Sequence, residues 1–450
     1  MAEFDLLIKG GTFVDGTLLP KHTTDVAISA GRIAEIGRIS SSRAKRVLDA
    51  DGLIVAPGFV DLHTHYDSQL QWDPWCSISG WHGVTSVALG NCGFGFAPVR
   101  PEERERSMLT MSRTEAIPME TMREGMLWDW ETFPEWMDTL DRIPKGVNCL
   151  SYMPLAPLMT YVMGLDNAKS RSSTPDELAE MQRLMREALS VGACGWSAQR
   201  MGTDGLQNDY DGTPMVTDTM SDHDAFAFAD ILGEKREGFI QITQATGDGP
   251  ADFKVVEQLA ERSGCPILYN VVFALDGVPQ LHRGMISWIE DCQRRGLRIF
   301  GQGQTVRATY YFNLDDWNLY DSSPAWREAT TGTREEKIRK LSDPDLRARM
   351  IGDVDSGKLS TWTVGGDMGE HIYQGSPNKP EHDELIGLTL HQIADRRGVH
   401  RAEVMIDLSI ETDLQGTFLT RSVTCVNADD IEEILASPYV FPGVSDGGAH

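Results

Sequence analysis

Alternating apolar and polar residues dominate the first 55 positions, and turn residues separate the runs. DLLIKGGTFVDG, DVAISAGRIAEIG and RVLDADGLIVAP show the period of two that is typical of β-strands. Ala30 and Gly31 lie between two such runs, where a hairpin turn would be expected. We therefore predict a small β-domain over residues 1–57.

From about residue 58 the pattern changes, and short apolar runs alternate with longer amphipathic segments such as PDELAEMQRLMREALSVG and DFKVVEQLAERSG. The apolar spacing of these two segments predicts helices, and a Gly ends each one. The apolar runs predict strands over residues 85–89, 147–152, 193–197, 239–243, 266–272, 298–301 and 440–444. With the run that begins at Leu53 they make eight strands, so we predict an α/β fold with a (β/α)8 TIM-like barrel over residues 58–450.

Two segments interrupt this alternation. Residues 100–144 are rich in Met, Glu and Trp and too long for a simple loop, so we expect helices over the mouth of the barrel. Residues 310–383 combine isolated aromatic residues and charges with little periodicity. We interpret this second segment as a lid or an oligomer contact rather than a domain.

The run LIVAPGFVDLHTHYD ends in two histidines separated by one residue. Because strand side chains alternate between faces, His63 and His65 point the same way and can meet one cation. The carboxyl ends of barrel strands form the mouth, where such barrels have their active sites. Two surface histidines are the simpler explanation, but Asp61 and Asp67 flank them, and this cluster of polar groups favours a metal site.

Two more candidate ligands follow other predicted strands. Cys92 lies in the Gly-rich turn GNCGFGFAP, where a thiolate would be a soft ligand for zinc, although a lone Cys is more often buried and inert. Asp446 lies in VSDGGAH after the last strand. This sequence suits a turn, but an Asp beside a metal-bound water can also bind the metal and accept the proton of that water.

Composition and charge narrow the choice of partners. The formal net charge is −26 and no long Lys/Arg run occurs, which disfavours nucleic acid and anionic membrane surfaces as partners. No secretory signal and no apolar run of about 18 residues is present, so we expect a cytoplasmic location. The seven cysteines are odd in number and show no Cys-x-x-Cys spacing, which disfavours a disulfide framework. We expect a small-molecule substrate, and the sequence is compatible with a homo-oligomer.

The motifs APGFVDLHTHYD, GVTSVALGNCGFGFAP, WDWETFPEWMDTLD, GACGWSAQ and SDGGAH belong to a set that spans most of the chain. This set resembles the amidohydrolase superfamily and, within it, the D-aminoacylase group of N-acyl-D-amino-acid deacylases. The resemblance implies a metal-dependent hydrolase of C–N bonds. It implies that His63, His65, Cys92 and Asp446 hold Zn²⁺ and that Asp446 is the catalytic proton acceptor.

The same resemblance implies a His at the end of the fifth and of the sixth barrel strand. Here those strands read GFIQITQATGD and PILYNVVF, so Gln241 (or its neighbours Thr243 and Gln244) and Asn270 stand at these positions. Amides are poor zinc ligands, and we therefore expect one tightly held ion rather than two. His371 and His382, in the second interrupting segment, are the alternative ligands.

We predict that Gln241, Asn270, Leu155, Met159 and His450 contact the substrate. Leu155 and Met159 replace a polar pair that the resemblance implies, and they indicate an apolar part of the substrate. The resemblance further implies that the chain would continue past His450 and complete the small β-domain.

Hydrolysis of an N-acyl amino acid or a related small amide is the first hypothesis. The alternative is a barrel that binds a small ligand without hydrolysing it, and metal content distinguishes the two. A third hypothesis makes Cys92 the nucleophile, with His63 or His65 as its general base.

Overall fold

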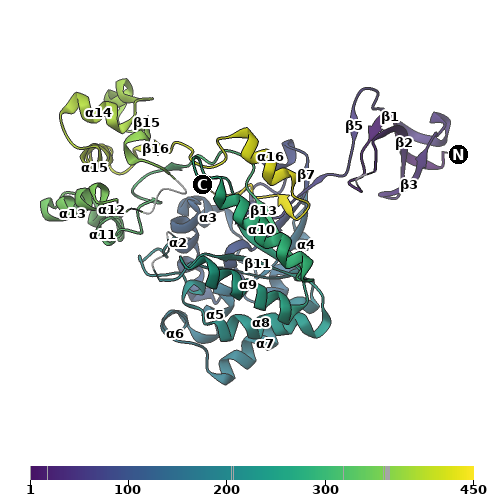
Figure 1. The fold of residues 1–450 in the computed structure, drawn as a ribbon, viewed down its shortest axis with the longest axis horizontal. Helices are drawn as coiled ribbons and strands as arrows, with labels where there is room; N and C mark the ends of the chain where they lie inside the picture. Colours follow the sequence, from purple (N-terminus) through teal and green to yellow (C-terminus); the bar gives the residue numbers. More distant parts are fainter. Residues whose placement is uncertain are drawn as a thin grey trace. The chain divides into compact units, whose positions relative to one another are not determined.

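The computed structural model describes residues 2–17, 19–203, 205, 207–317, 319–357, 359 and 365–449. The chain divides into two compact units, Met1–Phe59 and Val60–His450. Figure 1 shows the elements of both units. Among the described residues, every helix is too short or too polar to cross a membrane.

The first unit is a five-stranded sheet with the order β3-β2-β1-β4, in which β5 also pairs with β1. Its strands are β1 (Phe4–Phe13), β2 (His22–Ser29), β3 (Arg32–Gly37), β4 (Ala44–Asp49) and β5 (Ile54–Val55). Ala30 and Gly31 form the predicted turn between β2 and β3, both with positive φ. A small core of Phe4, Leu7, Ala27 and Ile39 confirms the predicted β-domain.

The second unit contains a ring of parallel strands. These are β6 (Phe59–Asp61), β7 (Val84–Leu89), β8 (Asn148–Ser151), β9 (Met153–Pro154), β10 (Gly195–Arg200), β11 (Phe239–Gln244), β12 (Ile267–Val272), β13 (Ile299–Gly303) and β17 (Val440–Pro442). Their order is β6-β7-β8 in one sheet and β9-β10-β11-β12-β13-β17 in the other. Only Tyr152 separates β8 from β9, so the two sheets are continuous along the chain.

The ring closes between the loops that follow β17 and β6. Thr64 and Gly447 form a parallel bridge, and the backbone N–H of His65 donates to the Gly447 carbonyl at 2.7 Å. Strands are present at all eight predicted places, and the TIM-like barrel is confirmed. The run that begins at Leu53 is divided, however: β5 pairs with β1 in the first unit, and β6 ends at Asp61, so that His63 and His65 lie in the loop after the strand rather than within it.

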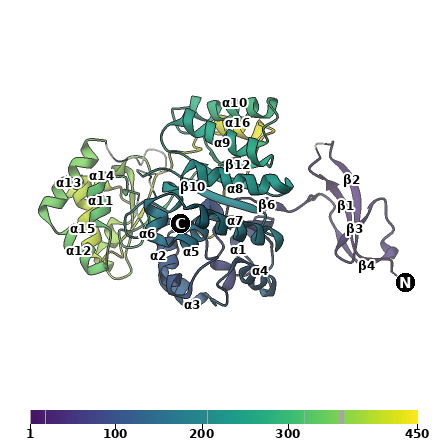
Figure 2. The same ribbon diagram turned by 90° about the horizontal axis from the view of Figure 1, so that it is seen from below.

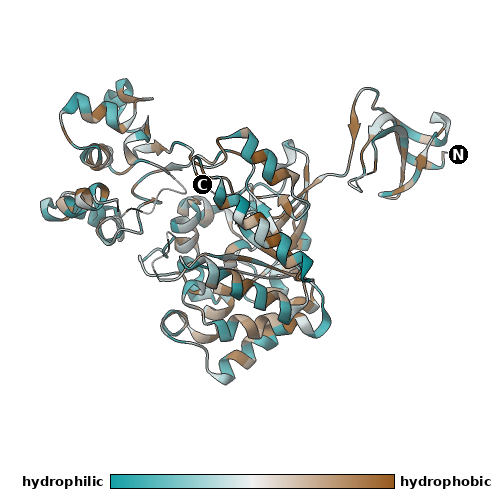
Figure 3. Ribbon diagram, in the orientation of Figure 1, coloured by the Kyte–Doolittle hydropathy of each residue, from teal (hydrophilic) through white to brown (hydrophobic). Residues whose placement is uncertain are grey.

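Amphipathic helices follow the barrel strands: α7 (Pro175–Ser190), α8 (Asp222–Lys235), α9 (Gly249–Ser263), α10 (Gln280–Arg294) and α16 (Ala428–Ala436). Figure 2 shows α8, α9 and α10 next to the strands, and Figure 3 shows hydrophilic and hydrophobic residues alternating along them. In α7 a capping box between Thr174 and Glu177 fixes the start, and the buried residues Met181, Met185 and Ala188 recur with helical spacing.

The first interrupting segment is helical, as expected. It contains α2 (Arg104–Glu115), α3 (Met119–Gly125) and α4 (Phe133–Arg142), and the remaining helices near it are α1 (Ser77–Trp81), α5 (Leu155–Met163) and α6 (Leu165–Ser170). Trp130 and Trp136 are buried in the same core as the barrel strands, and the Trp130 indole N–H donates to the Phe96 carbonyl at 2.7 Å. These contacts hold the segment against the barrel.

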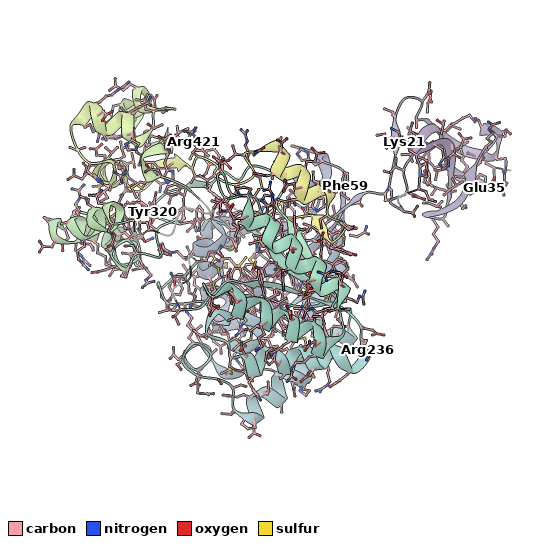
Figure 4. The ribbon with its side chains drawn as sticks, in the orientation of Figure 1. Lys21, Glu35, Phe59, Arg236, Tyr320 and Arg421 are labelled. Atoms are coloured by element: carbon pink, nitrogen blue, oxygen red, sulfur yellow. The ribbon has the colours of Figure 1, made fainter. Side chains whose placement is uncertain are left out.

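The second interrupting segment belongs to the same compact unit as the barrel and contributes to a second hydrophobic core. Its elements are β14 (Tyr311–Phe312), α11 (Pro324–Ala329), α12 (Arg334–Leu341), α13 (Pro344–Asp355), β15 (Ile372–Gly375), α14 (Leu390–Arg397), α15 (Arg401–Glu411) and β16 (Thr417–Leu419). Tyr320, labelled in Figure 4, is buried in this second core together with Trp326, Tyr373 and Phe418. Much of the buried surface comes from residues beyond 383, which explains why the shorter segment shows little periodicity.

Two buried ion pairs fix helix α2. Asp209, which is 2% exposed, accepts hydrogen bonds from Arg106 Nη1 at 2.7 Å and Lys169 Nζ at 2.6 Å. Arg113 donates through Nε to Asp321 Oδ2 at 3.1 Å and through Nη1 to the Thr330 carbonyl at 2.9 Å. Helix α2 is therefore attached both to the loop after β10 and to the segment that carries the second core.

We expect Asp209→Asn to lower the free energy of unfolding by about 3 kcal/mol, because it leaves two largely buried cations, 14% and 12% exposed, without their shared anion. Burial raises the pKa of Asp209, but the hydrogen bonds and charges of Arg106 and Lys169 outweigh burial and lower this pKa to about 2. The stabilising contribution is therefore present above the ordinary pKa of 3.8 and is lost as the pH falls toward about 2.

Urea unfolding of wild type and Asp209→Asn between pH 7 and pH 2 measures the loss of stability and its pH dependence. The matched control is Asp211→Asn, because Asp211 lies 3.8 Å from Arg106 and 3.6 Å from Lys169 but its side chain is 37% exposed. Equal loss of stability in the two variants would contradict the account.

Candidate metal centre

Three buried side chains lie together at the barrel mouth. Single ligand atoms of His63, His65 and Cys92 are all within 4.8 Å of one another, and these residues are 1%, 2% and 6% exposed. His63 Nε2 and Cys92 Sγ are 3.3 Å apart. The structure thus brings together residues that follow two different strands.

His63 is oriented by a residue that the sequence did not reveal. Gln302 on β13 donates from Nε2 to the Leu62 carbonyl at 3.0 Å, which directs its Oε1 toward His63 Nδ1 at 3.2 Å. His63 Nδ1 then carries the proton, and Nε2 keeps its lone pair for a cation. A glutamine in a strand has no sequence signal that would identify this role.

Cys92 is positioned by a tight turn after β7. Gly90, Cys92 and Gly93 all have positive φ, of 76°, 56° and 77°. A Cβ on Gly93 would lie 3.0 Å from the Ala198 Cα, so the close approach to β10 requires glycine at this position. The backbone N–H of Cys92 donates to Gln241 Oε1 at 2.7 Å, which fixes the turn from β11.

Asp446 follows β17 and lies beside both histidines. Its Oδ1 is 3.5 Å from His63 Nε2 and 3.8 Å from His65 Nε2. The side chain is 36% exposed, whereas the two imidazoles are almost completely buried. Asp446 can therefore contact a cation and a solvent molecule at once. His450 lies outside the described residues.

Glu115, the last residue of α2, is a fifth donor that the sequence did not indicate. It is 2% exposed, and its Oε2 lies 3.6 Å from His65 Nε2. Burial raises the pKa of Glu115 well above its ordinary value, and the nearby charges of Asp446 and Asp67 act in the same direction. Burial likewise raises the pKa of the Cys92 thiol well above its ordinary value. A bound cation would favour the ionised form of both groups.

The five donors border a cavity of about 880 Å³. Its other polar lining includes Gln199, Thr243, Gln244, Asn270, Gln304 and Thr424, and its apolar lining includes Phe253, Tyr269, Phe273, Leu281, Met285, Tyr310 and Trp317. The cavity therefore offers a small molecule both hydrogen-bonding groups and an apolar wall.

Of the residues predicted to contact the substrate, Asn270 lines the cavity, whereas Gln241, Leu155 and Met159 do not. The Nδ2 of Asn270 donates to Thr243 Oγ1 at 2.9 Å. Gln241 is fully buried behind Cys92, and Leu155 and Met159 are fully buried on α5 in the barrel core. These three side chains are absent from the residues that line the cavity.

The two alternative histidine ligands lie elsewhere. His371 is fully buried against Phe312 in the second core, with 5.6 Å between the ring centroids, and burial lowers its pKa to about 4. His382 Nε2 lies 3.2 Å from Glu411 Oε2. In the described part of the chain, neither histidine joins the cluster of His63, His65 and Cys92.

The donor set fits zinc. Zinc bonds of about 2.0–2.2 Å to nitrogen and oxygen in a tetrahedron place neighbouring donors roughly 3.3–3.6 Å apart. The separations of Asp446 from His63 and of Glu115 from His65, 3.5 and 3.6 Å, fall in this range, and that of Asp446 from His65 is 3.8 Å. Imidazole, thiolate and carboxylate are also the ligand types that zinc accepts.

Comparison with known proteins identifies relatives over different parts of the chain. An uncharacterized protein of Mycobacterium tuberculosis is 27% identical over 477 residues, which covers 99% of this chain and 74% of that protein. A D-aminoacylase of Alcaligenes xylosoxydans is 36% identical over 196 residues, covering 43% of this chain and 37% of that enzyme.

Solved structures share the fold. The N-acyl-D-glutamate deacylase from Bordetella bronchiseptica, complexed with zinc and a phosphonate inhibitor, has a TM-score of 0.65 at 19% identity and covers 99% of this chain and 76% of that chain. A crystal structure of D-aminoacylase has a TM-score of 0.62 at 20% identity, with 98% and 75% covered. Residues 46–449 match the amidohydrolase family, and the chain belongs to that family.

Proposed function

We propose that this protein is a metal-dependent amidohydrolase that cleaves the amide C–N bond of an N-acyl amino acid or a related small amide. The observation that carries the proposal is the convergence of His63, His65, Cys92 and Asp446 on one wall of a cavity large enough for such a molecule. The partial match to a D-aminoacylase and the fold shared with a deacylase that was solved with zinc support the substrate class.

Zn²⁺ held by these residues would polarise a carbonyl and lower the pKa of a water molecule. Asp446 is the group that accepts the proton, because its carboxylate touches both histidines and is partly open to solvent. The same carboxyl group then donates this proton to the leaving nitrogen, so that the C–N bond breaks without expelling an amide anion. The buried imidazoles orient the site and exclude water from one side of it.

Asn270 supplies a hydrogen-bonding group for the substrate. Its Oδ1 is buried and accepts no hydrogen bond from the described residues, while its Nδ2 is committed to Thr243. A buried acceptor without a donor costs about 1–3 kcal/mol, and an amide N–H of the substrate would remove this cost. Phe253, Phe273 and Met285, which line the same cavity, provide an apolar surface for an acyl group.

We expect His63→Ala and His65→Ala each to abolish hydrolysis and to reduce the zinc content of the purified protein, while the fold is retained. Elemental analysis and turnover of a panel of N-acyl-D- and N-acyl-L-amino acids measure both effects. His223→Ala is the control, because this side chain on α8 is 77% exposed. Unchanged turnover in the double His63, His65 variant would refute the metal mechanism.

We expect at most one tightly held metal ion per chain. Two histidines with Asp446 or Cys92 provide the three protein ligands that one catalytic zinc needs. Gln241 does not supply a ligand for a second ion, because its side chain faces the Cys92 backbone rather than the cavity. Dialysis against a chelator followed by elemental analysis measures the retained metal. Two retained equivalents would contradict this expectation.

We expect Asn270→Ala to lower kcat/KM by about tenfold, as loss of one buried hydrogen bond of roughly 1–1.5 kcal/mol predicts. Zinc content should stay at the wild-type level, since Asn270 is not one of the clustered ligands. Steady-state kinetics together with elemental analysis tests this. Loss of metal along with activity would show that Asn270 acts on the metal site and not on the substrate.

A further inference from the structure

We propose that Glu115 is a ligand of the bound cation, supplied by the interrupting segment and not by a barrel strand. This inference rests on the metal site of the proposed function and adds a residue to it. Glu115 Oε2 lies 3.6 Å from His65 Nε2, a separation that two donors on one zinc ion would have. Glu115 also lines the cavity that the other four donors line.

Each of the five donors lies within 4 Å of at least one other. Cys92 is next to His63 at 3.3 Å, His63 is next to Asp446 at 3.5 Å, Asp446 is next to His65 at 3.8 Å, and His65 is next to Glu115 at 3.6 Å. His65 thus has a carboxylate on either side. A cation bound to His65 Nε2 therefore has the Asp446 and Glu115 carboxylates as its neighbouring donors.

Charge supports the same assignment. Glu115 is 2% exposed, and a divalent cation beside it would offset the cost of burying its negative charge. Two carboxylates and two neutral imidazoles balance a divalent cation. The last turn of a helix favours cations, because the helix dipole places negative potential there, and Glu115 is the last residue of α2.

The ion pairs of helix α2 fix the position of Glu115 before a cation binds. Arg113, two residues before it, is 5% exposed and paired with Asp321, and Arg106 at the other end of α2 is paired with Asp209. Ala116, with φ of 55°, ends the helix directly after Glu115. A ligand held by a rigid helix needs no reorganisation when the cation binds.

The alternative role for Glu115 is contact with a positively charged group of the substrate. Metal affinity measured without substrate distinguishes the two roles. Glu115→Gln keeps the size of the side chain and removes its charge, and Glu115→Asp keeps the charge but withdraws it by one methylene. The matched control is Glu105→Gln on the same helix, because that carboxylate is 56% exposed and pairs with Arg123.

The first measurement is the Zn²⁺ dissociation constant, obtained by competition between metal-free protein and a chromophoric chelator. The second is the visible absorption spectrum of the Co²⁺-loaded protein. We expect Glu115→Gln to weaken Zn²⁺ binding by at least about tenfold, since loss of even an outer partner of a metal ligand has that effect. The Co²⁺ spectrum should change as well. The Zn²⁺ affinity of Glu115→Asp should lie between the affinities of wild type and Glu115→Gln. The affinity of Glu105→Gln should equal that of wild type.

The outcomes separate this assignment from the proposed function. If wild type binds Zn²⁺ and Glu115→Gln binds it equally well with an unchanged Co²⁺ spectrum, Glu115 is not a ligand and the remaining site stands. If wild type binds metal but hydrolyses no amide, the proposed function is wrong, and the affinity difference still supports Glu115 as a ligand. If wild type binds no divalent cation, both proposals are wrong.

Discussion

The site depends on the closure of the barrel between its last and first strands. The hydrogen bond from the His65 N–H to the Gly447 carbonyl, and the Thr64–Gly447 bridge, join the loop after β17 to the loop after β6. This contact sets the register of the two loops. Because Asp446 precedes Gly447, the same contact places its carboxylate between the two imidazoles. A shift of one residue would turn Asp446 or the histidines away from the site.

A second constraint comes from helix α2, which barrel geometry alone does not specify. Its buried pairs, Arg106 with Asp209 and Arg113 with Asp321, connect the helix to the loop after β10 and to the segment of the second core. Buried pairs of this kind add little net stability, but they fix geometry, because an alternative packing would leave a charge unpaired. The helix that carries Glu115 is therefore held both by these ion pairs and by the apolar packing of Met108 and Met111 in the main core.

The sequence predicted the parts that depend on local pattern. Short apolar runs between amphipathic segments identified the barrel strands. The positions of His63, Cys92 and Asp446 after separate strands predicted their meeting, because parallel strands end at the same rim. Glu115 and Gln302 could not be predicted, since their roles depend on tertiary contacts to His65 and His63. The second core was missed because its buried surface is assembled from segments far apart in the sequence.

These contacts link the second core to the chemistry of the barrel mouth. Asp321 directly follows Tyr320, which is fully buried in the second core, and Asp321 holds Arg113 only two residues before Glu115. Arg113 and Glu115 both lie in the last turn of helix α2. The segment from β14 to β16 also contributes Trp317 to the lining of the cavity, and among its described residues no side chain belongs to the cluster of His63, His65 and Cys92.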